Sequence, residues 1–185
     1  MAKYARGYER KNSDTKNLIW LVAIIVVVIA LGIGAVVIYN HVKKDAVTLE
    51  SYGQYHITDF SKTLTMSEDD YLIYIYDEHS AAKSDSQVLK YMKALEEKKV
   101  TTQLYLVNYD DVSSSSSDST ITANATAFKN AIKYDSYQVG DLMVVKVDKD
   151  FNPASQIYTN QNSSDKIISG LKALLKGQQA FGLGE

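Results

Sequence analysis

The sequence predicts an α/β protein in which an N-terminal transmembrane helix precedes one three-layer α/β/α domain with a mixed sheet. Three observations predict it. Residues 18–38 form an uninterrupted apolar run without a charge. From Tyr71 onward, short apolar runs of strand length alternate with stretches whose apolar residues recur every three or four positions, the spacing of helices. The chain has no cysteine, so its outer domain of about 140 residues must be held by an apolar core, which that length can supply.

The apolar run from Leu18 to Ile38 predicts an uncleaved signal-anchor helix. At 1.5 Å per residue, its twenty-one residues match a hydrocarbon core of roughly 30 Å. A cleaved signal peptide is the competing interpretation. The apolar region of a signal peptide is only roughly 7–15 residues long. The best candidate cleavage site, at Ala35, lies inside the apolar run of this chain. Ala30 and Gly34 form one small-xxx-small step, which would allow a weak homodimer through the anchor.

Basic residues predict the orientation of this helix. Five of them precede it and two closely follow it: Lys3, Arg6, Arg10, Lys11 and Lys16 against Lys43 and Lys44. The positive-inside rule then places the tail 1–17 in the cytoplasm and the C-terminal domain on the extracytoplasmic side of the cell membrane. The lipid bilayer is therefore the first expected partner.

The outer part of the chain is acidic. From residue 45 onward it has thirteen lysines and twenty acidic residues, and both arginines of the chain precede the anchor. Such a surface argues against a nucleic-acid partner. The absence of cysteine excludes disulfides, thiolate metal sites and thiol oxidoreductase activity.

The predicted elements begin with a stalk, residues 39–57, that includes a possible first strand near Val47–Tyr55. The domain proper is expected over residues 58–176 and opens with a short helix in Thr58–Leu64. The run Tyr71–Tyr76 (YLIYIY) is typical of a central strand that is covered on both faces.

The first long helix follows a polar turn. Ser84 with Gln87 predicts a capping box at its start. Its apolar face is expected to hold Val88, Leu89, Tyr91, Met92 and Leu95. Gln103–Tyr109 predicts a second strand, and the Ser-rich stretch 112–121 predicts a solvated loop without a core of its own.

The last third of the chain repeats this alternation. Helical spacing returns with Ala127, Phe128, Ala131 and Ile132, and again with Ile167, Ile168, Leu171, Leu174 and Leu175. Between these helices we expect a third strand (Leu142–Val147), a turn (Asp148–Pro153) and a strand that hairpins back (Ala154–Tyr158). Ser163 or Ser164 would cap the last helix, and residues 177–185 would form a flexible tail. Right-handed crossovers predict that the first three strands are parallel and the fourth is antiparallel at an edge.

The strand-to-helix stretch YLIYIYDEHSAAK, with this order of elements, resembles the thioredoxin-like superfamily over residues 58–176. In that family the central strand leads into a Cys-x-x-Cys at the start of the first long helix. Here the motif position is held by Ser80, Ala81, Ala82 and Lys83, with Ser80 and Lys83 expected one helical turn apart. The family also places a cis-proline before the third core strand, where this sequence reads Val139-Gly140-Asp141-Leu142; the only proline is Pro153.

The resemblance implies a role without redox chemistry. Membrane-tethered thioredoxin-like proteins are commonly thiol oxidoreductases or accessory factors for exported proteins, and the first role requires thiols. We therefore expect a redox-inactive domain that binds an exported or envelope protein as an accessory or scaffold. An enzyme and a structural ectodomain that oligomerises through its anchor are the alternatives.

The enzymatic alternative would use a candidate functional rim formed by Asp77, Glu78 and His79, together with Asp141. Open α/β sheets usually place their sites at the carboxyl ends of strands. A nucleophilic Ser80 would need a base that hydrogen-bonds it, and a sequence neighbour such as His79 rarely reaches that geometry. Carboxylates and imidazole also bind divalent metals with help from another loop. A solvated turn is the plainer interpretation, so the sequence predicts no catalytic residue, cofactor or metal.

Tyrosine is abundant, with fourteen residues. Tyr74 and Tyr105 lie in predicted strands and are expected in the core. Another group could form an exposed patch for protein contact: Tyr52, Tyr55, Tyr134 and Tyr137.

Overall fold

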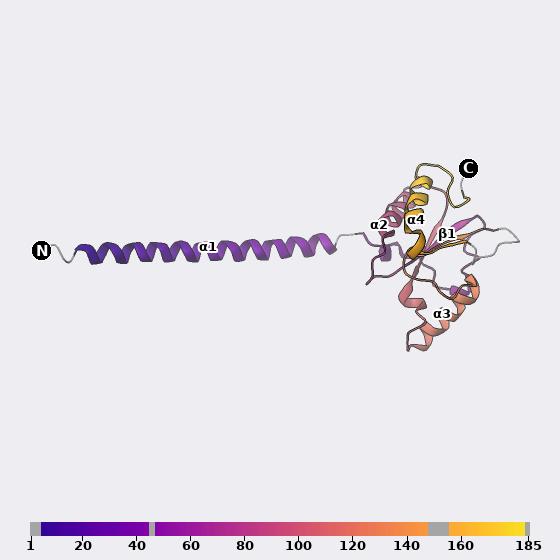
Figure 1. Cartoon of the computed structure of the whole chain (residues 1–185), viewed down its shortest axis with the longest axis horizontal. Coiled ribbons are helices and arrows are strands. Elements are labelled where there is room, and N and C mark those ends of the chain that lie inside the picture. The colour runs from indigo at the N-terminus through magenta and orange to yellow at the C-terminus, as the bar shows by residue number, and fades with distance from the viewer. Residues whose placement is uncertain (1–4, 45–46, 148–155, 184–185) are drawn as a thin grey trace. The chain divides into compact units, whose positions relative to one another are not determined.

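The computed structural model describes residues 5–44, 47–147 and 156–183. The chain divides into two compact units, Met1–Val47 and Thr48–Glu185. In the first unit, α1 runs from Ala5 to Lys44 (Figure 1). Over the part of the chain that is described, it is the one helix long and apolar enough to cross a membrane, at Thr15–Gly34, and no protein packs on it there.

The second unit is built on a mixed sheet of order β2-β1-β3-β4. The strands are β1 (Tyr71–Tyr76), β2 (Leu104–Asn108), β3 (Leu142–Val145) and β4 (Ile157–Tyr158). β2 pairs parallel with β1, β3 pairs antiparallel with β1, and β4 pairs antiparallel with β3. Every residue of β1 is buried, as the uninterrupted apolar run predicts for a central strand. The α/β class and the mixed sheet are thus confirmed.

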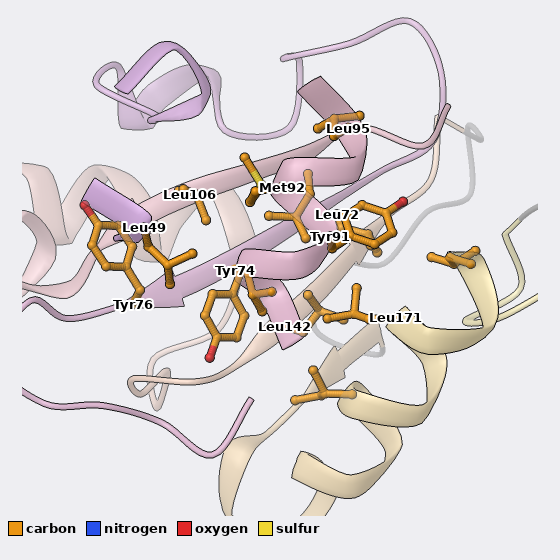
Figure 2. Packing of buried hydrophobic residues seen from close by; sticks show 14 of the residues in the cluster. Leu49, Leu72, Tyr74, Tyr76, Tyr91, Met92, Leu95, Leu106, Leu142 and Leu171 are labelled. Carbon is orange, nitrogen blue, oxygen red and sulfur yellow. The ribbon is translucent and has the colours of Figure 1, made fainter. Parts of the chain in front are cut away.

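Helices cover both faces of this sheet (Figure 1). On one face lie α2 (Asp85–Glu96) and α4 (Asn160–Leu174), and on the other lies α3 (Ser119–Ile132). Because successive side chains of a strand point to opposite faces, β1 supplies both cores. Leu72, Tyr74 and Tyr76 pack with α2 and α4 (Figure 2), whereas Tyr71, Ile73 and Ile75 pack with α3.

The direction of β3 corrects the prediction of three parallel strands. The chain begins β3 at the edge where β1 ends, since the Gly140 N–H donates to the Ile75 carbonyl at 2.7 Å. The buried Tyr137 hydroxyl also donates to the Val112 carbonyl, which joins the segment before β3 to the start of the Ser-rich loop. The connection from β2 to β3 therefore starts and ends at the same edge of the sheet, and the two strands run in opposite directions. The right-handed crossover rule concerns parallel strands, so it does not apply to this connection.

The segment before β1 also differs from the prediction. The possible strand near Val47–Tyr55 is a 3-10 helix, η1 (Leu49–Tyr55), in which Leu49 and Tyr52 are buried. The backbone of η1 is kinked at Tyr52, whose φ and ψ are −90° and 39°. The short helix expected in Thr58–Leu64 is one 3-10 turn, η2 (Phe60–Lys62).

The last helix begins earlier than the sequence predicts, and the chain that follows it packs against β4. α4 begins at Asn160, before the expected caps Ser163 and Ser164. After α4 the chain folds back, so the Phe181 ring lies 5.0 Å from the Tyr158 ring between centroids and Leu183 is buried. The fourth strand is confirmed over Ile157–Tyr158, while the turn Asp148–Pro153 lies outside the described residues.

Candidate functional site

The loop between β1 and α2 meets the loop that precedes β3. Gly140 is the point of contact: a β-carbon placed on it would lie 2.7 Å from the β-carbon of Ala82 and 2.7 Å from Cγ of Asn160. Gly140 also has φ of +88°, a conformation that glycine adopts without strain. The side chain of Ala82 thus packs against the backbone of Gly140, where an added β-carbon would meet it and Asn160.

Asp141, which the sequence places in the functional rim, is buried and serves the start of α4. Its carboxylate accepts hydrogen bonds from the Asn160 N–H at 2.7 Å and from the Gln138 N–H at 2.9 Å. Burial raises the pKa of Asp141 above its ordinary value, and the two backbone hydrogen bonds partly offset this. Asp141 is therefore buried and caps a helix, whereas Glu78 and His79 of the predicted rim are exposed.

A half-buried carboxylate, Asp85, lies at the start of α2. Asp85 accepts hydrogen bonds from the Tyr74 hydroxyl at 2.5 Å and from the Ala82 N–H at 2.7 Å. Burial raises the pKa of Asp85, and these hydrogen bonds oppose that rise. The predicted capping box does not form, because the Ser84 hydroxyl lies 2.7 Å from the Tyr74 hydroxyl and makes no cap bond.

The first long helix begins after residues 80–83. α2 begins at Asp85, so Ser80 and Lys83 are not one helical turn apart. Ala82 and Asp85 are one turn apart, because the Asp85 N–H donates to the Ala82 carbonyl at 3.2 Å. Ser80 is exposed, and the Lys83 ammonium forms an exposed ion pair with Asp165 at 2.7 Å.

The Asp77–Ser80 rim is an exposed turn held by local bonds. Asp77 accepts from the His79 N–H at 2.7 Å, and Glu78 accepts from the Asn108 side-chain amide at 3.2 Å. The His79 ring faces Asp110 at 3.9 Å rather than Ser80. Among the described residues, no three histidine or acidic side chains converge as metal ligands.

Sequence reasoning missed a polar cluster beside this rim. The Tyr76 hydroxyl donates to the Glu50 carboxylate and lies 3.4 Å from Nε2 of His56. Burial raises the pKa of Tyr76, and the Glu50 hydrogen bond adds to the rise. Asp111 lies near enough to Glu50 and His56 to feel both charges. Glu50 and His56 come from the presumed stalk, so no local motif marked them.

The surface of the second unit is largely polar. Within its described part, Val147 is the only large hydrophobic residue that is strongly exposed. The predicted tyrosine patch is wrong, since Tyr52 and Tyr137 are buried and Tyr55 and Tyr134 are half-buried. Tyr74 is fully buried, as expected.

No family model matches the chain, and no significant match was found among curated proteins or solved structures.

Proposed function

We propose that the protein is a single-pass, membrane-anchored, redox-inactive thioredoxin-like domain that binds an exported or envelope protein on the extracytoplasmic side. It serves that partner as an accessory or scaffold. The proposal rests on one observation above the others. The start of α2 packs on the loop before β3 through Ala82 and Gly140, while neither position offers a thiol.

The fold supports the thioredoxin-like part of the proposal. The elements follow the order strand, helix, strand, helix, strand, strand, helix, and helices lie on both faces of a mixed sheet. Two carboxylates near the junction accept hydrogen bonds from backbone N–H groups: Asp85 from Ala82, and Asp141 from Asn160 and Gln138. These bonds hold the loops on either side of Gly140, and Ser80 and Ala81 of the first loop are exposed.

The surface supports binding by polar contacts. With so little exposed apolar area, a partner would be held by hydrogen bonds and charge, as in transient interfaces. The binding surface is centred on the exposed loop residues Ser80 and Ala81, which precede the contact between Ala82 and Gly140.

A position-specific photocrosslinker tests this in native membranes. The photoreactive amino acid p-benzoylphenylalanine at Ala81 of the full-length chain should give one discrete adduct with another protein. The same group at Asn130, which is exposed on α3 across the sheet, is the matched control and should not give that adduct. Excess purified wild-type protein should compete the adduct away.

Two results would count against the proposal. Adducts of equal yield from both positions would mean that capture is nonspecific. An adduct with the mass of two copies of this chain would favour the structural ectodomain that oligomerises through its anchor.

A further inference from the structure

The helices α2 and α4 lie side by side on one face of the sheet and run in the same direction (Figure 1). Near their N-terminal ends, the Lys83 ammonium pairs with Asp165 at 2.7 Å. At their C-terminal ends a small cavity lies between them, lined by Tyr91 from α2 and by Leu174 and Gly177 from the end of α4. The C-terminal halves of the two helices therefore share one surface.

Lysine is concentrated on this surface. Residues 90–102 and 166–178 contain seven of the thirteen lysines that follow residue 44, but only two of the twenty acidic residues. All seven lysine side chains are exposed. Of the two carboxylates, Glu97 is already paired with Lys99 at 2.6 Å. These seven lysines form a basic face on a domain that is acidic as a whole.

The rest of the outer part has the opposite balance, with six lysines and eighteen acidic residues. The acidic run Glu68–Asp70 starts on the α3 side of the sheet, because Met66 packs in the core beneath α3 and its carbonyl accepts from the Tyr105 hydroxyl at 3.1 Å. Asp118 and Asp135 flank α3 itself. An anionic surface therefore attracts the α2–α4 side of the domain and repels the α3 side.

We propose that the basic face docks on the anionic lipid headgroups of the membrane that α1 crosses. The inference rests on the anchor of the proposed function but not on its protein partner. Only three residues separate Lys44, the last residue of α1, from Thr48, and a fully extended connection of this length spans at most roughly 14 Å.

This short connection favours lipid over a polyanion in solution. It keeps the domain at a high effective concentration near the headgroups, whereas a soluble polyanion has no such advantage. Lysine ammonium groups close to an anionic bilayer are attracted to it, and the attraction adds over the basic face. In the docked state α3 is the layer farthest from the bilayer, since it covers the opposite face of the sheet.

Fluorescence quenching of the full-length chain in nanodiscs tests the docking. Because the natural chain has no cysteine, a single fluorophore can be attached through Gln178→Cys, which is exposed just after α4, or through Asn130→Cys, which is exposed on α3. A nitroxide on the lipid headgroup quenches a fluorophore that lies close to it. The comparison is between nanodiscs of equal parts phosphatidylglycerol and phosphatidylcholine and nanodiscs of phosphatidylcholine alone.

Quenching at position 178 should be roughly threefold stronger in the anionic nanodiscs than in the neutral ones. It should fall when the salt concentration rises from about 0.1 M to about 1 M, because the screening length shortens from about 10 Å to about 3 Å. Position 130 should show neither effect. Both measurements use the unaltered basic face, so they do not depend on how a charge variant folds.

Charge reversal identifies the lysines that make the contact. Lys172→Glu/Lys176→Glu should remove the lipid dependence at position 178. Lys129→Glu/Lys133→Glu is the matched control, because it reverses two lysines with the same spacing at the C-terminal end of α3. This control should keep the lipid dependence.

The failures of the docking and of the anchor are distinguishable. Equal quenching at position 178 in both kinds of nanodisc would overturn the docking and leave the anchor intact. A chain that does not co-purify with nanodiscs would overturn the anchor and the docking together. A lipid dependence that survives Lys172→Glu/Lys176→Glu, or that is equal at position 130, would also overturn the docking. So would polyphosphate binding through these lysines without any effect of anionic lipid, which would assign the basic face to a soluble polyanion.

Discussion

The carboxylate of Asp141 accepts a hydrogen bond from the backbone N–H of Asn160 at 2.7 Å and so caps a helix that begins 19 residues further along the chain. The same side chain accepts from Gln138 in the loop before β3. One buried residue therefore fixes the start of a strand and the start of α4 together. It also sets the position of Gly140, on which the α2 loop packs.

Asp141→Ala should destabilise the domain by about 2–4 kcal/mol. The variant loses the carboxylate that accepts from the first N–H of α4 and leaves two part-buried backbone N–H groups without that acceptor. Urea unfolding followed by far-ultraviolet circular dichroism measures the change. Asp118→Ala is the control: Asp118 caps α3 through Thr120 and Ile121 but is exposed, so its loss should cost only about 1 kcal/mol. Equal costs for the two variants would contradict the buried role of Asp141.

Gly140→Ala should be destabilising by about 1–3 kcal/mol, because the new methyl group would overlap Ala82 and Asn160 at a positive φ. Gly53→Ala is the matched control, since nothing lies within 4 Å of its added β-carbon. It should be neutral or slightly stabilising. Thermal unfolding of both variants compares them directly, and a tolerated Gly140→Ala would mean that the two loops do not pack as described.

Stability should decrease as the pH rises above about 4. Burial raises the pKa values of Asp85 and Asp141 above the ordinary value of 3.8. The folded state therefore retains protons that the unfolded chain has already lost. The stability that these protons contribute is complete below the unfolded pKa and is lost as the pH rises through the folded pKa.

The urea midpoint between pH 4.5 and 7.5 measures this slope. Asp85→Asn should flatten it, whereas Asp135→Asn, at an exposed carboxyl, should not. The exposed Asp59 and Glu97 act in the opposite direction, since hydrogen bonds from Ser61 and Lys99 lower their pKa values. A midpoint that rises with pH would show that such lowered groups dominate.

The sequence predicted what depends on local pattern and missed what depends on distant partners. The sequence predicts both ends of β1 correctly, because a run of six apolar and aromatic residues is typical of a strand that is buried on both faces. The segment before β3 is bonded to the Val112 carbonyl by Tyr137, 25 residues away, and the start of α4 is capped by Asp141, 19 residues away. The Tyr76–Glu50 bond joins residues 26 apart, and neither residue belongs to a recognisable motif. Such contacts are set by tertiary packing.

The orientation of α1 is a separate prediction, carried by the basic residues that flank it. A cysteine introduced at Ser115 in the exposed Ser-rich loop should react with a membrane-impermeant maleimide on intact cells. A cysteine at Ala5 should react only after the cells are permeabilised. Because the natural chain has no cysteine, the unmodified protein gives the background. Labelling of Ala5→Cys alone on intact cells would reverse the predicted topology.

The last prediction distinguishes two positions for the motif that the thioredoxin-like proposal requires. In the structure Ala82 and Asp85 are one turn apart at the start of α2, and the Asp85 side chain already reaches back to the Ala82 N–H. Ala82→Cys/Asp85→Cys should therefore form an intramolecular disulfide under mild oxidation. Ser80→Cys/Lys83→Cys is the matched pair with the same spacing. Both of its residues precede α2, whereas Ala82 and Asp85 are joined by a turn hydrogen bond, so it should form the disulfide less readily.

Thiol reactivity gives a second readout on the reduced double variants. The helix N-terminus favours a thiolate, so the cysteine at position 82 should react faster with iodoacetamide than the one at position 80. Each double variant is equilibrated in glutathione buffers of graded redox ratio, and mass spectrometry measures the fraction of protein that carries the disulfide. The two fractions are then compared at each redox ratio. If the pair at positions 80 and 83 forms the more stable disulfide, the motif position is Ser80–Lys83, as the sequence predicts. If neither pair closes in the folded protein, the thioredoxin-like proposal loses the positional support that Ala82 and Gly140 give it.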